Sequence, residues 1–178
     1  MDTAIIMPAR NEGKTIAGVI AGALKYGTVI VVDDGSDDDT YRAAKASGAV
    51  VLRHAVNLGK GAALKTGCDY AVLKGFSRIV AIDADAQHEP KQIPDFLKLL
   101  DENDIVFGYR TFSSEMPSVF RFGNKFINWI ASSLYGVKLR DTQCGYRAFT
   151  ADAYKKIRWR SRDYSVESEM ITSTGRAR

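Results

Sequence analysis

Short apolar runs that end in clusters of polar residues constrain this chain more than any other feature of its sequence. Runs rich in β-branched residues predict strands at Thr3–Met7, Thr28–Val32, Ala49–Arg53, Arg78–Ile82 and Asp104–Phe107. Between them, apolar residues at helical spacing predict helices over 16–24, 64–72 and 93–100, the last starting near Pro90. Strands that alternate with helices favour an α/β fold with a mainly parallel central sheet flanked by helices.

Length and composition favour a single soluble domain over residues 1–178. The chain is 46% hydrophobic and 26% charged, which suffices for a substantial core. No run of about 18 apolar residues that could cross a membrane occurs, and Met1–Pro8 indicates a first strand, not a signal peptide. Two cysteines, Cys68 and Cys144, are too few for a disulfide framework, which favours a reduced, cytosolic setting. The net charge of +4 permits anionic partners, but the basic residues are scattered, so we expect no nucleic-acid binding.

Three polar clusters follow predicted strands, at residues 8–12, 33–37 and 83–88. In an open parallel sheet, ligands bind beyond the carboxyl ends of the strands. We therefore expect the three clusters to form one site, and their agreement in position carries more weight than any single motif.

Asp83 and Asp85 flank Ala84 directly after a predicted strand, and Gln87 follows two residues later. These side chains offer hard oxygen ligands in one short loop, which suits Mg²⁺ or Mn²⁺ completed by waters and substrate phosphates. The alternative is an aspartate that caps the helix starting near Pro90. The position at a strand end favours the metal site.

Asp34 ends the second predicted strand, where a carboxylate can accept hydrogen bonds from a nucleotide base or ribose. The alternative for this stretch is helix capping by Ser36 or Asp37. Both interpretations are compatible with the sequence, and Asp34 is the candidate for binding.

The turn Gly59-Lys60-Gly61 precedes the predicted helix over 64–72. Glycines allow a ligand to approach the backbone, and Lys60 adds charge at a helix N-terminus that favours phosphate. A plain turn is the alternative, and the spacing of a P-loop is absent. Neither His54 nor His88 has a partner at metal-ligand spacing, which argues against zinc; His88 is expected to support the metal loop.

Residues 118–131 form an aromatic and basic segment with helical periodicity. Trp129 shares its apolar face with phenylalanines, and Arg121 and Lys125 could point toward lipid phosphates at a membrane surface. An ordinary helix that faces the core is the alternative. Further on, Asp141 and Arg147 suit either acceptor or phosphate contacts or a structural ion pair.

Together these motifs resemble those of family 2, inverting glycosyltransferases with the GT-A fold, and most closely the dolichol-phosphate mannose synthases and related polyprenyl-phosphate glycosyltransferases. The matching segments, in the order of that family, are 8–12, 33–40, 57–61, 83–90, 108–110, 141–147 and 169–170. Arg10 departs from the pattern, because many relatives have a tyrosine there.

The resemblance implies roles for individual residues. Contacts to the donor base and ribose are implied for Pro8, Arg10, Glu12, Val32 and Asp34. Asp83, Asp85 and Gln87 would lie at the diphosphate and metal, with Asp85 and Gln87 as direct ligands, Ala84 beside the donor, and Arg110 at a phosphate of donor or acceptor.

The resemblance also implies a reaction: metal-dependent transfer of a sugar, with inversion, from a donor of the GDP-mannose or UDP-glucose type to polyprenyl or dolichyl phosphate. The protein would be peripheral at the cytoplasmic face of the membrane. A sugar hydroxyl as acceptor is the alternative, with Asp141 as base. Residues 1–110 would bind the donor, and 111–178 would form an incomplete acceptor and membrane part. Relatives continue beyond Met170, so we expect a C-terminally truncated GT-A domain, or a donor-binding domain without turnover.

Overall fold

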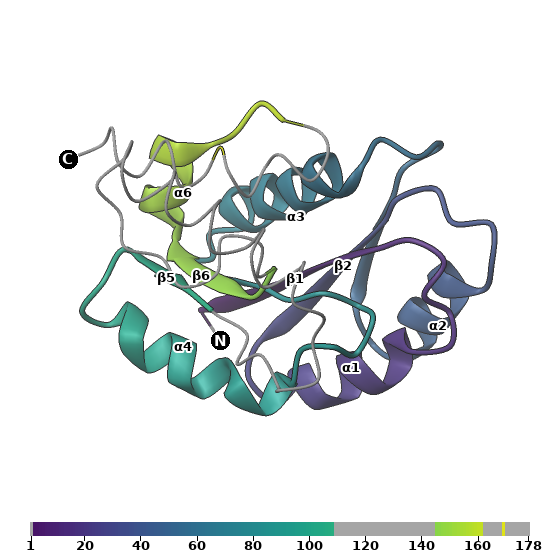
Figure 1. Ribbon diagram of the computed structural model, residues 1–178, viewed down its shortest axis with the longest axis horizontal. Coiled ribbons are helices and arrows are strands. Elements are labelled where there is room, and N and C mark those ends of the chain that lie inside the picture. The colour runs from purple at the N-terminus through teal and green to yellow at the C-terminus, as the bar shows by residue number, and fades with distance from the viewer. Residues whose placement is uncertain (1, 109–144, 162–168, 170–178) are drawn as a thin grey trace, which may run out of the picture.

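The computed structural model describes residues 2–108, 145–161 and 169 (Figure 1). Its centre is a six-stranded sheet in the order β3-β2-β1-β4-β6-β5. Only β6 runs antiparallel to its neighbours β4 and β5 within this described sheet, so the expected mainly parallel α/β sheet is confirmed. The strands are β1 (Thr3–Ala9), β2 (Thr28–Asp33), β3 (Val50–Arg53), β4 (Arg78–Ala81), β5 (Ile105–Phe107) and β6 (Arg147–Thr150).

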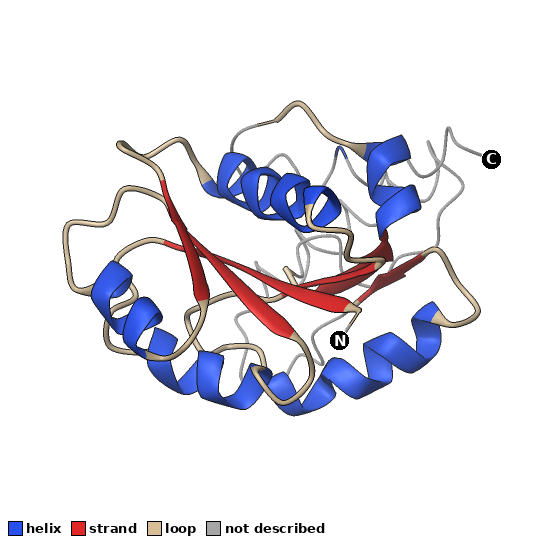
Figure 2. Ribbon diagram, turned by 180° about the vertical axis from the view of Figure 1, so that it is seen from behind, coloured by secondary structure: helices blue, strands red, loops and turns tan. Residues whose placement is uncertain are grey.

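Helices cover both faces of this sheet (Figure 2). On one face lie α1 (Ile16–Ala23), α2 (Thr40–Ala46) and α4 (Ile93–Leu100), the last preceded by the 3₁₀ turn η1 (Pro90–Gln92). On the other lie α3 (Lys60–Leu73) and α6 (Ala151–Ile157). A hydrophobic core lies on each face of the sheet. Alternate strand residues pack in one core or the other, because successive side chains in a strand point to opposite faces. Ile5 packs in the core with α1, whereas Ile6 packs in the core with α3.

The expected strands agree with the structure to within two residues at each end. The spacing of apolar residues did not predict two helices, α2 and α6. Helix α2 buries only Thr40 and Ala44, and α6 is a short helix whose N-cap, Thr150, accepts a hydrogen bond from Ala153 N at 3.1 Å. The alternative in which Ser36 or Asp37 caps a helix is wrong, because α2 begins at Thr40 with Asp39 at its N-cap.

Helix α3 lies unusually close to the sheet at Gly67. A Cβ placed on this residue would stand 3.2 Å from Val32 Cγ2 and closer still to Ile6 Cγ2. Side chains in a packed core do not tolerate such overlap without shifting. Glycine at this position therefore sets the distance between α3 and strands β1 and β2.

The segment from α6 to Trp159 forms hydrogen bonds with α3. Tyr154 donates a hydrogen bond to Asp69 Oδ1 at 2.6 Å, and the Arg158 guanidinium binds both oxygens of the same carboxylate. The buried Trp159 indole donates to Gly61 O at 3.0 Å, in the first turn of α3. Burial would raise the pKa of Asp69, but the hydrogen bonds from Arg158 and Tyr154 outweigh it and lower the pKa.

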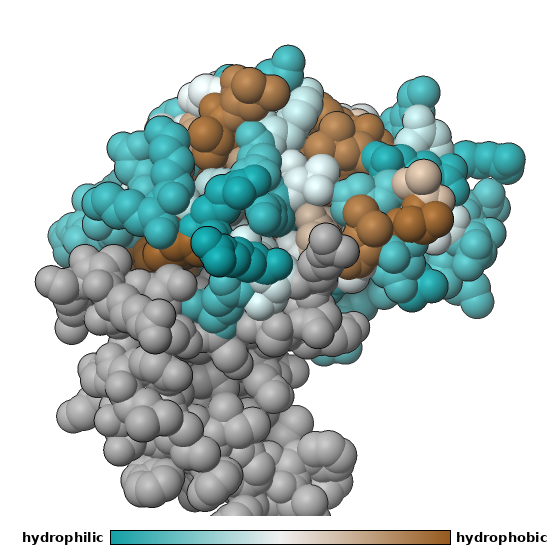
Figure 3. Space-filling view, turned by 90° about the horizontal axis from the view of Figure 1, so that it is seen from above, coloured by the Kyte–Doolittle hydropathy of each residue, from teal (hydrophilic) through white to brown (hydrophobic). Residues whose placement is uncertain are grey.

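Figure 3 shows hydrophobic patches separated by hydrophilic residues on one face of the described surface. The exposed large hydrophobics are Val56, Leu58, Leu73 and Leu99. Within the described ranges, no helix combines the length and apolarity needed to cross a bilayer.

The close packing of α3 predicts opposite effects for the same substitution in two helices. Gly67→Ala should lower the free energy of unfolding by about 1–3 kcal/mol, because the new methyl group overlaps Ile6. Gly18→Ala in α1 is the matched control, since a Cβ there meets no atom within 4 Å. It should raise the free energy of unfolding by up to about 1 kcal/mol through helix propensity. Urea unfolding monitored by circular dichroism measures both, and a neutral or stabilising Gly67→Ala would contradict the packing argument.

The lowered pKa of Asp69 predicts how its contribution to stability depends on pH. A carboxyl group whose pKa is lower in the folded state stabilises the fold above its unfolded value of about 3.9, and this contribution disappears as the pH falls through the folded pKa. Asp69→Asn should therefore reduce stability at pH 7, and its deficit against the unmodified protein should shrink below about pH 4. Asp104→Asn serves as control, because this exposed side chain has no partner among the described residues. A deficit for Asp69→Asn that is constant from pH 7 to pH 3 would exclude this origin.

Candidate functional site

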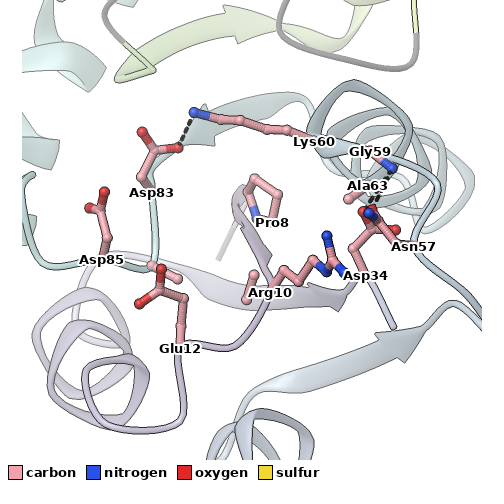
Figure 4. Close-up of a pocket in the computed structure, with 12 residues that line it drawn as sticks. Pro8, Arg10, Glu12, Asp34, Asn57, Gly59, Lys60, Ala63, Asp83 and Asp85 are labelled. Carbon is pink, nitrogen blue, oxygen red and sulfur yellow. Dashed lines mark hydrogen bonds and ion pairs between the residues drawn. The ribbon is translucent and has the colours of Figure 1, made fainter. Parts of the chain in front are cut away.

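A cavity of about 310 Å³ opens where β1, β2 and β4 end and α3 begins (Figure 4). The expected site residues that line it are Pro8, Arg10, Glu12, Asp34, Lys60, Asp83, Ala84 and Asp85, and they are joined by Ala9, Asn57, Gly59 and Ala63. These residues come from segments far apart in the sequence. They meet because the carboxyl ends of parallel strands share one edge of the sheet.

The loops after β1 and β2 are joined by hydrogen bonds. Asn11 N donates to Ser36 Oγ at 3.0 Å, Asp37 N donates to Asn11 Oδ1 at 3.0 Å, and Glu12 N donates to Thr40 Oγ1 at 2.7 Å. Asn11 adopts a left-handed backbone with φ 57°, a conformation that asparagine tolerates better than most residues. These contacts hold Arg10 and Glu12 at the rim of the cavity, and they explain why Ser36 and Asp37 do not cap α2.

The buried carboxylate of Asp34 connects three segments. Its Oδ1 accepts from His54 Nδ1 at 2.7 Å and from Leu58 N at 2.9 Å, and its Oδ2 accepts from Gly59 N at 2.8 Å. A carboxylate offers about four acceptor positions. These contacts occupy three of them, so Asp34 retains capacity for one further donor from a ligand in the cavity.

The neighbouring Asp33 has a structural role. Its side chain is fully buried, with Oδ1 accepting from Ser36 N at 3.0 Å and Oδ2 lying 3.1 Å from Arg53 Nε. Gly35 follows with φ 66°, and a Cβ there would lie 2.7 Å from Asn57 N. Only glycine permits this approach between the loop after β2 and the turn before α3.

Asp83 is held on several sides. Lys60 Nζ lies 2.8 Å from its Oδ1, and His88 Nδ1 lies 3.6 Å from its Oδ2. A Cβ on Gly145 would overlap the same carboxylate, with Asp83 Cγ only 2.9 Å away. The His88 ring also lies against Tyr146 in a tilted arrangement, with ring centres 5.1 Å apart. The expected support of this loop by His88 is therefore present in the structure.

Asp85 makes fewer contacts within the described residues than Asp83 does. Its Oδ1 accepts from Gln87 N at 3.0 Å across a turn in which Ala86 has φ 63°. Neither Asp83 nor Asp85 caps the following helix, since η1 has Glu89 at its N-cap and no side-chain cap bond. The helix-capping alternative for this motif is thus excluded. Gln87 is exposed and does not line the cavity.

Two other expected residues lie away from the cavity wall. Val32 is fully buried in β2, opposite Pro8 of β1. Arg147 is only 2% exposed in β6, with its guanidinium carbon 5.8 Å from the Phe107 ring centre. It lines a small hollow with Lys60 and Asp83 beneath the ion pair. Buried there, the side chain does not face an open membrane surface, and its role toward an acceptor stays a prediction.

The remaining expected residues lie outside the described part of the chain: Arg110, Arg121, Lys125, Trp129 and Asp141. His54 was missed as a member of this site. The signal was available, because His54 directly follows the third strand, as Asp34 follows the second. A search for metal-ligand spacing could not find it, since its partners are a carboxylate and a hydroxyl from other segments.

The cavity thus combines carboxylates with cations. Asp85 and Glu12 offer oxygens, Lys60 offers an ammonium group, and Figure 4 shows these side chains around one opening. The N-terminal end of α3, at Gly59 and Lys60, faces the same space. Such a set suits a ligand that carries both phosphate and polar groups, bound together with a hard cation.

Known proteins are similar to this chain in sequence. The model of the family described as glycosyl transferase family 2 matches residues 4–159. The undecaprenyl-phosphate mannosyltransferase of Micrococcus luteus is 32% identical over 96% of this chain and 76% of that protein. The UDP-N-acetylglucosamine–dolichyl-phosphate N-acetylglucosaminyltransferase of Methanococcus voltae is 30% identical over 94% of this chain and 77% of that protein.

Solved structures agree on the fold. A crystal structure of glucosyl-3-phosphoglycerate synthase from Mycobacterium tuberculosis with phosphoglyceric acid matches with a TM-score of 0.80 at 23% identity, over 98% of this chain and 65% of that one. The complex with Mn²⁺, uridine-diphosphate-glucose and phosphoglyceric acid matches with a TM-score of 0.78 at 25% identity, over 97% of this chain and 64% of that one. The chain therefore spans just under two thirds of these structures. From its sequence match, its relatives and its GT-A fold, the chain belongs to glycosyl transferase family 2.

Proposed function

We propose that the cavity binds a nucleotide-sugar donor together with Mg²⁺ or Mn²⁺, and that the sugar is transferred with inversion to a polyprenyl or dolichyl phosphate. The observation that carries this proposal is the meeting of Asp34, Lys60 and Asp85 around one cavity. The two relatives named above, both transferases to polyprenyl or dolichyl phosphates by name, support the acceptor class.

The nucleoside would lie toward Asp34. Its free acceptor position suits a base N–H or a ribose hydroxyl, and Pro8 and Arg10 border the same part of the cavity. Glu12 has one oxygen engaged, because Thr15 Oγ1 donates to its Oε2 at 2.8 Å, and its other oxygen is available to ribose. Such polar pairing selects one nucleotide over another more sharply than apolar contact does.

The residues present fit a divalent cation. Asp85 presents a carboxylate to the cavity, and within the described residues no group of three or more His, Cys, Asp or Glu gathers into a self-sufficient metal cage. Mg²⁺ is typically held by one or two carboxylates plus substrate phosphates. We propose Asp85 as the direct ligand. Asp83, already paired with Lys60, would position the loop, and the role expected for Gln87 stays a prediction.

Lys60 and the start of α3 would hold the diphosphate. The Lys60 ammonium already lies in the cavity, and helix N-termini favour anions. When bound, the divalent cation would neutralise charge that grows on the departing diphosphate. The side chains of the protein would orient the donor so that the acceptor approaches the face opposite to the leaving group.

The proposed step is one displacement at the anomeric carbon. An acceptor phosphate oxygen forms the new bond to this carbon, and the bond to the nucleoside diphosphate breaks with its electron pair on the departing oxygen. A phosphate monoester has a second pKa of about 6, so its oxygen is ionised near neutral pH and needs no strong base. Arg110 at a phosphate and Asp141 as base for a hydroxyl acceptor belong to the same proposal.

Membrane association also stays within the proposal. We propose that Arg121, Lys125 and Trp129, outside the described residues, contact the membrane at its cytoplasmic face, and that Arg147 lies on the acceptor side. Residues 1–178 would act as one domain, with donor binding in 1–110 and acceptor binding in the remainder. Support comes from the lipid-phosphate acceptors in the names of the relatives.

Donor binding can be tested without assuming the donor. A thermal-shift panel of GDP-, UDP- and dTDP-sugars, each with and without Mn²⁺, should raise the melting temperature for one base only, and only with the metal present. At a ligand concentration of a hundred times Kd, binding adds about 2.7 kcal/mol of stability. A panel without any shift would contradict donor binding by this cavity.

The role of Asp85 is tested by Asp85→Asn, with Asp104→Asn as a distant exposed control. The first variant should lose at least about a hundredfold in transfer at saturating Mn²⁺, because charge stabilisation by a bound metal amounts to several kcal/mol; the control should retain full activity. Transfer is measured to polyprenyl phosphate in detergent, with 3-phosphoglycerate as a second acceptor. Undiminished transfer by Asp85→Asn would exclude this ligand. Donor binding without transfer to either acceptor would favour a binding domain without turnover.

A further inference from the structure

A histidine that is mostly buried stands behind the cavity and makes contacts through both ring nitrogens. His54 Nδ1 lies 2.7 Å from Asp34 Oδ1, and His54 Nε2 lies 3.0 Å from Thr66 Oγ1. The side chains of His54 and Asp34 are only 11% and 5% exposed. His54 does not line the cavity, whereas Asp34 does. Any influence of His54 on a ligand must therefore pass through Asp34.

The partners define what the ring does. An ionised carboxylate only accepts hydrogen bonds, so Nδ1 must carry a proton toward Asp34. Nε2 faces a hydroxyl that can donate or accept, which satisfies this nitrogen in either protonation state of the ring. Thr66 belongs to α3, and His54 N donates to Asp33 O at 2.9 Å at the end of β2. The ring is thus fixed in orientation between the sheet and α3.

Asp34 would keep its place in the fold without His54, but it would lose orientation. Leu58 N and Gly59 N still bind one oxygen each. These two donors lie on the turn before α3, in which Leu58 is exposed. His54 directly follows β3, and its ring is the side-chain donor that links the Asp34 carboxylate to the end of that strand. Without the hydrogen bond from His54, the remaining acceptor position of Asp34 would no longer have a fixed orientation.

We propose that His54 is a positioning residue that sets affinity for the nucleoside part of the donor by orienting the Asp34 carboxylate, with Thr66 fixing its ring. This inference rests on the proposed donor site. It extends that site by one residue that touches no ligand. It also gives Thr66, on the sheet-facing side of α3, a part in donor selection.

Two near-isosteric variants separate the ring nitrogens. In His54→Asn, the amide nitrogen takes the place of Nδ1 and keeps the hydrogen bond to Asp34. In His54→Gln, the amide lies near Nε2, so the contact to Thr66 is kept and the one to Asp34 is lost. Hydrogen bonds to charged groups are strong enough that losing one weakens binding about tenfold or more. His54→Gln should show this loss, and His54→Asn should recover most of it.

The experiment measures the Kd of Mn²⁺–GDP and Mn²⁺–UDP by calorimetry for the full chain and both variants, together with donor KM and kcat where transfer is observed. For His54→Gln, Kd and KM should rise together while kcat changes by less than about twofold. In an Asp34→Asn background the same substitution should have almost no further effect, as expected when two residues act through one contact.

Each outcome decides a different point. If the unmodified protein binds neither nucleotide, a donor of the GDP-mannose or UDP-glucose type is excluded and this inference fails with it. If it binds one of them and His54→Gln binds equally well, only the role of His54 is overturned. Equal losses for the Asn and Gln variants would show that the ring acts by packing, which also overturns it. Both variants should melt within a few degrees of the unmodified protein, and failure to fold would assign His54 to the fold instead of the site.

Discussion

The carboxylate of Asp34 is the interaction on which the rest of the site depends. It accepts hydrogen bonds from β3 through His54 and from the turn before α3 through Leu58 and Gly59. A buried carboxylate is costly unless donors surround it, so these segments must come together for the fold to be stable. The same contacts place Lys60 at the mouth of the cavity. Stability of the sheet edge and the geometry of the site are thus one requirement.

In each of the two acidic pairs of this site, Asp33 with Asp34 and Asp83 with Asp85, the two carboxylates have different roles. Asp33 is buried against Ser36 and Arg53, which leaves Asp34 to face the cavity. Asp83 is paired with Lys60, whereas Asp85 binds only the turn that it belongs to. One carboxylate of each pair builds the loop, and the other has capacity for a ligand.

The sequence was informative where a short range of residues decides the structure. Buried parallel strands appear as continuous apolar runs, so acids at the strand ends could be placed at one edge of the sheet, where Asp34 and Asp85 line the cavity. Their roles toward a ligand stay predictions. Helix α2 escaped because it buries only Thr40 and Ala44, and α6 because it is held by Tyr154 and by contacts distant in sequence. The role of His54 escaped for the same reason, since its two partners lie 20 and 12 residues away. Side-chain contacts between residues distant in sequence depend on the tertiary structure, which the periodicity of apolar residues does not predict.

Residues 145–161 support the proposed donor site although they lie far from it in the sequence. Strand β6 lies inside the sheet between β4 and β5, and it carries Arg147 beneath the Lys60–Asp83 ion pair. Trp159 then binds Gly61 O in the first turn of α3, one residue from Lys60. Gly145 leaves just enough room for the Asp83 carboxylate. The residues proposed to contact the donor thus lie within 1–110, and residues from 145–161 support the geometry at Lys60 and Asp83.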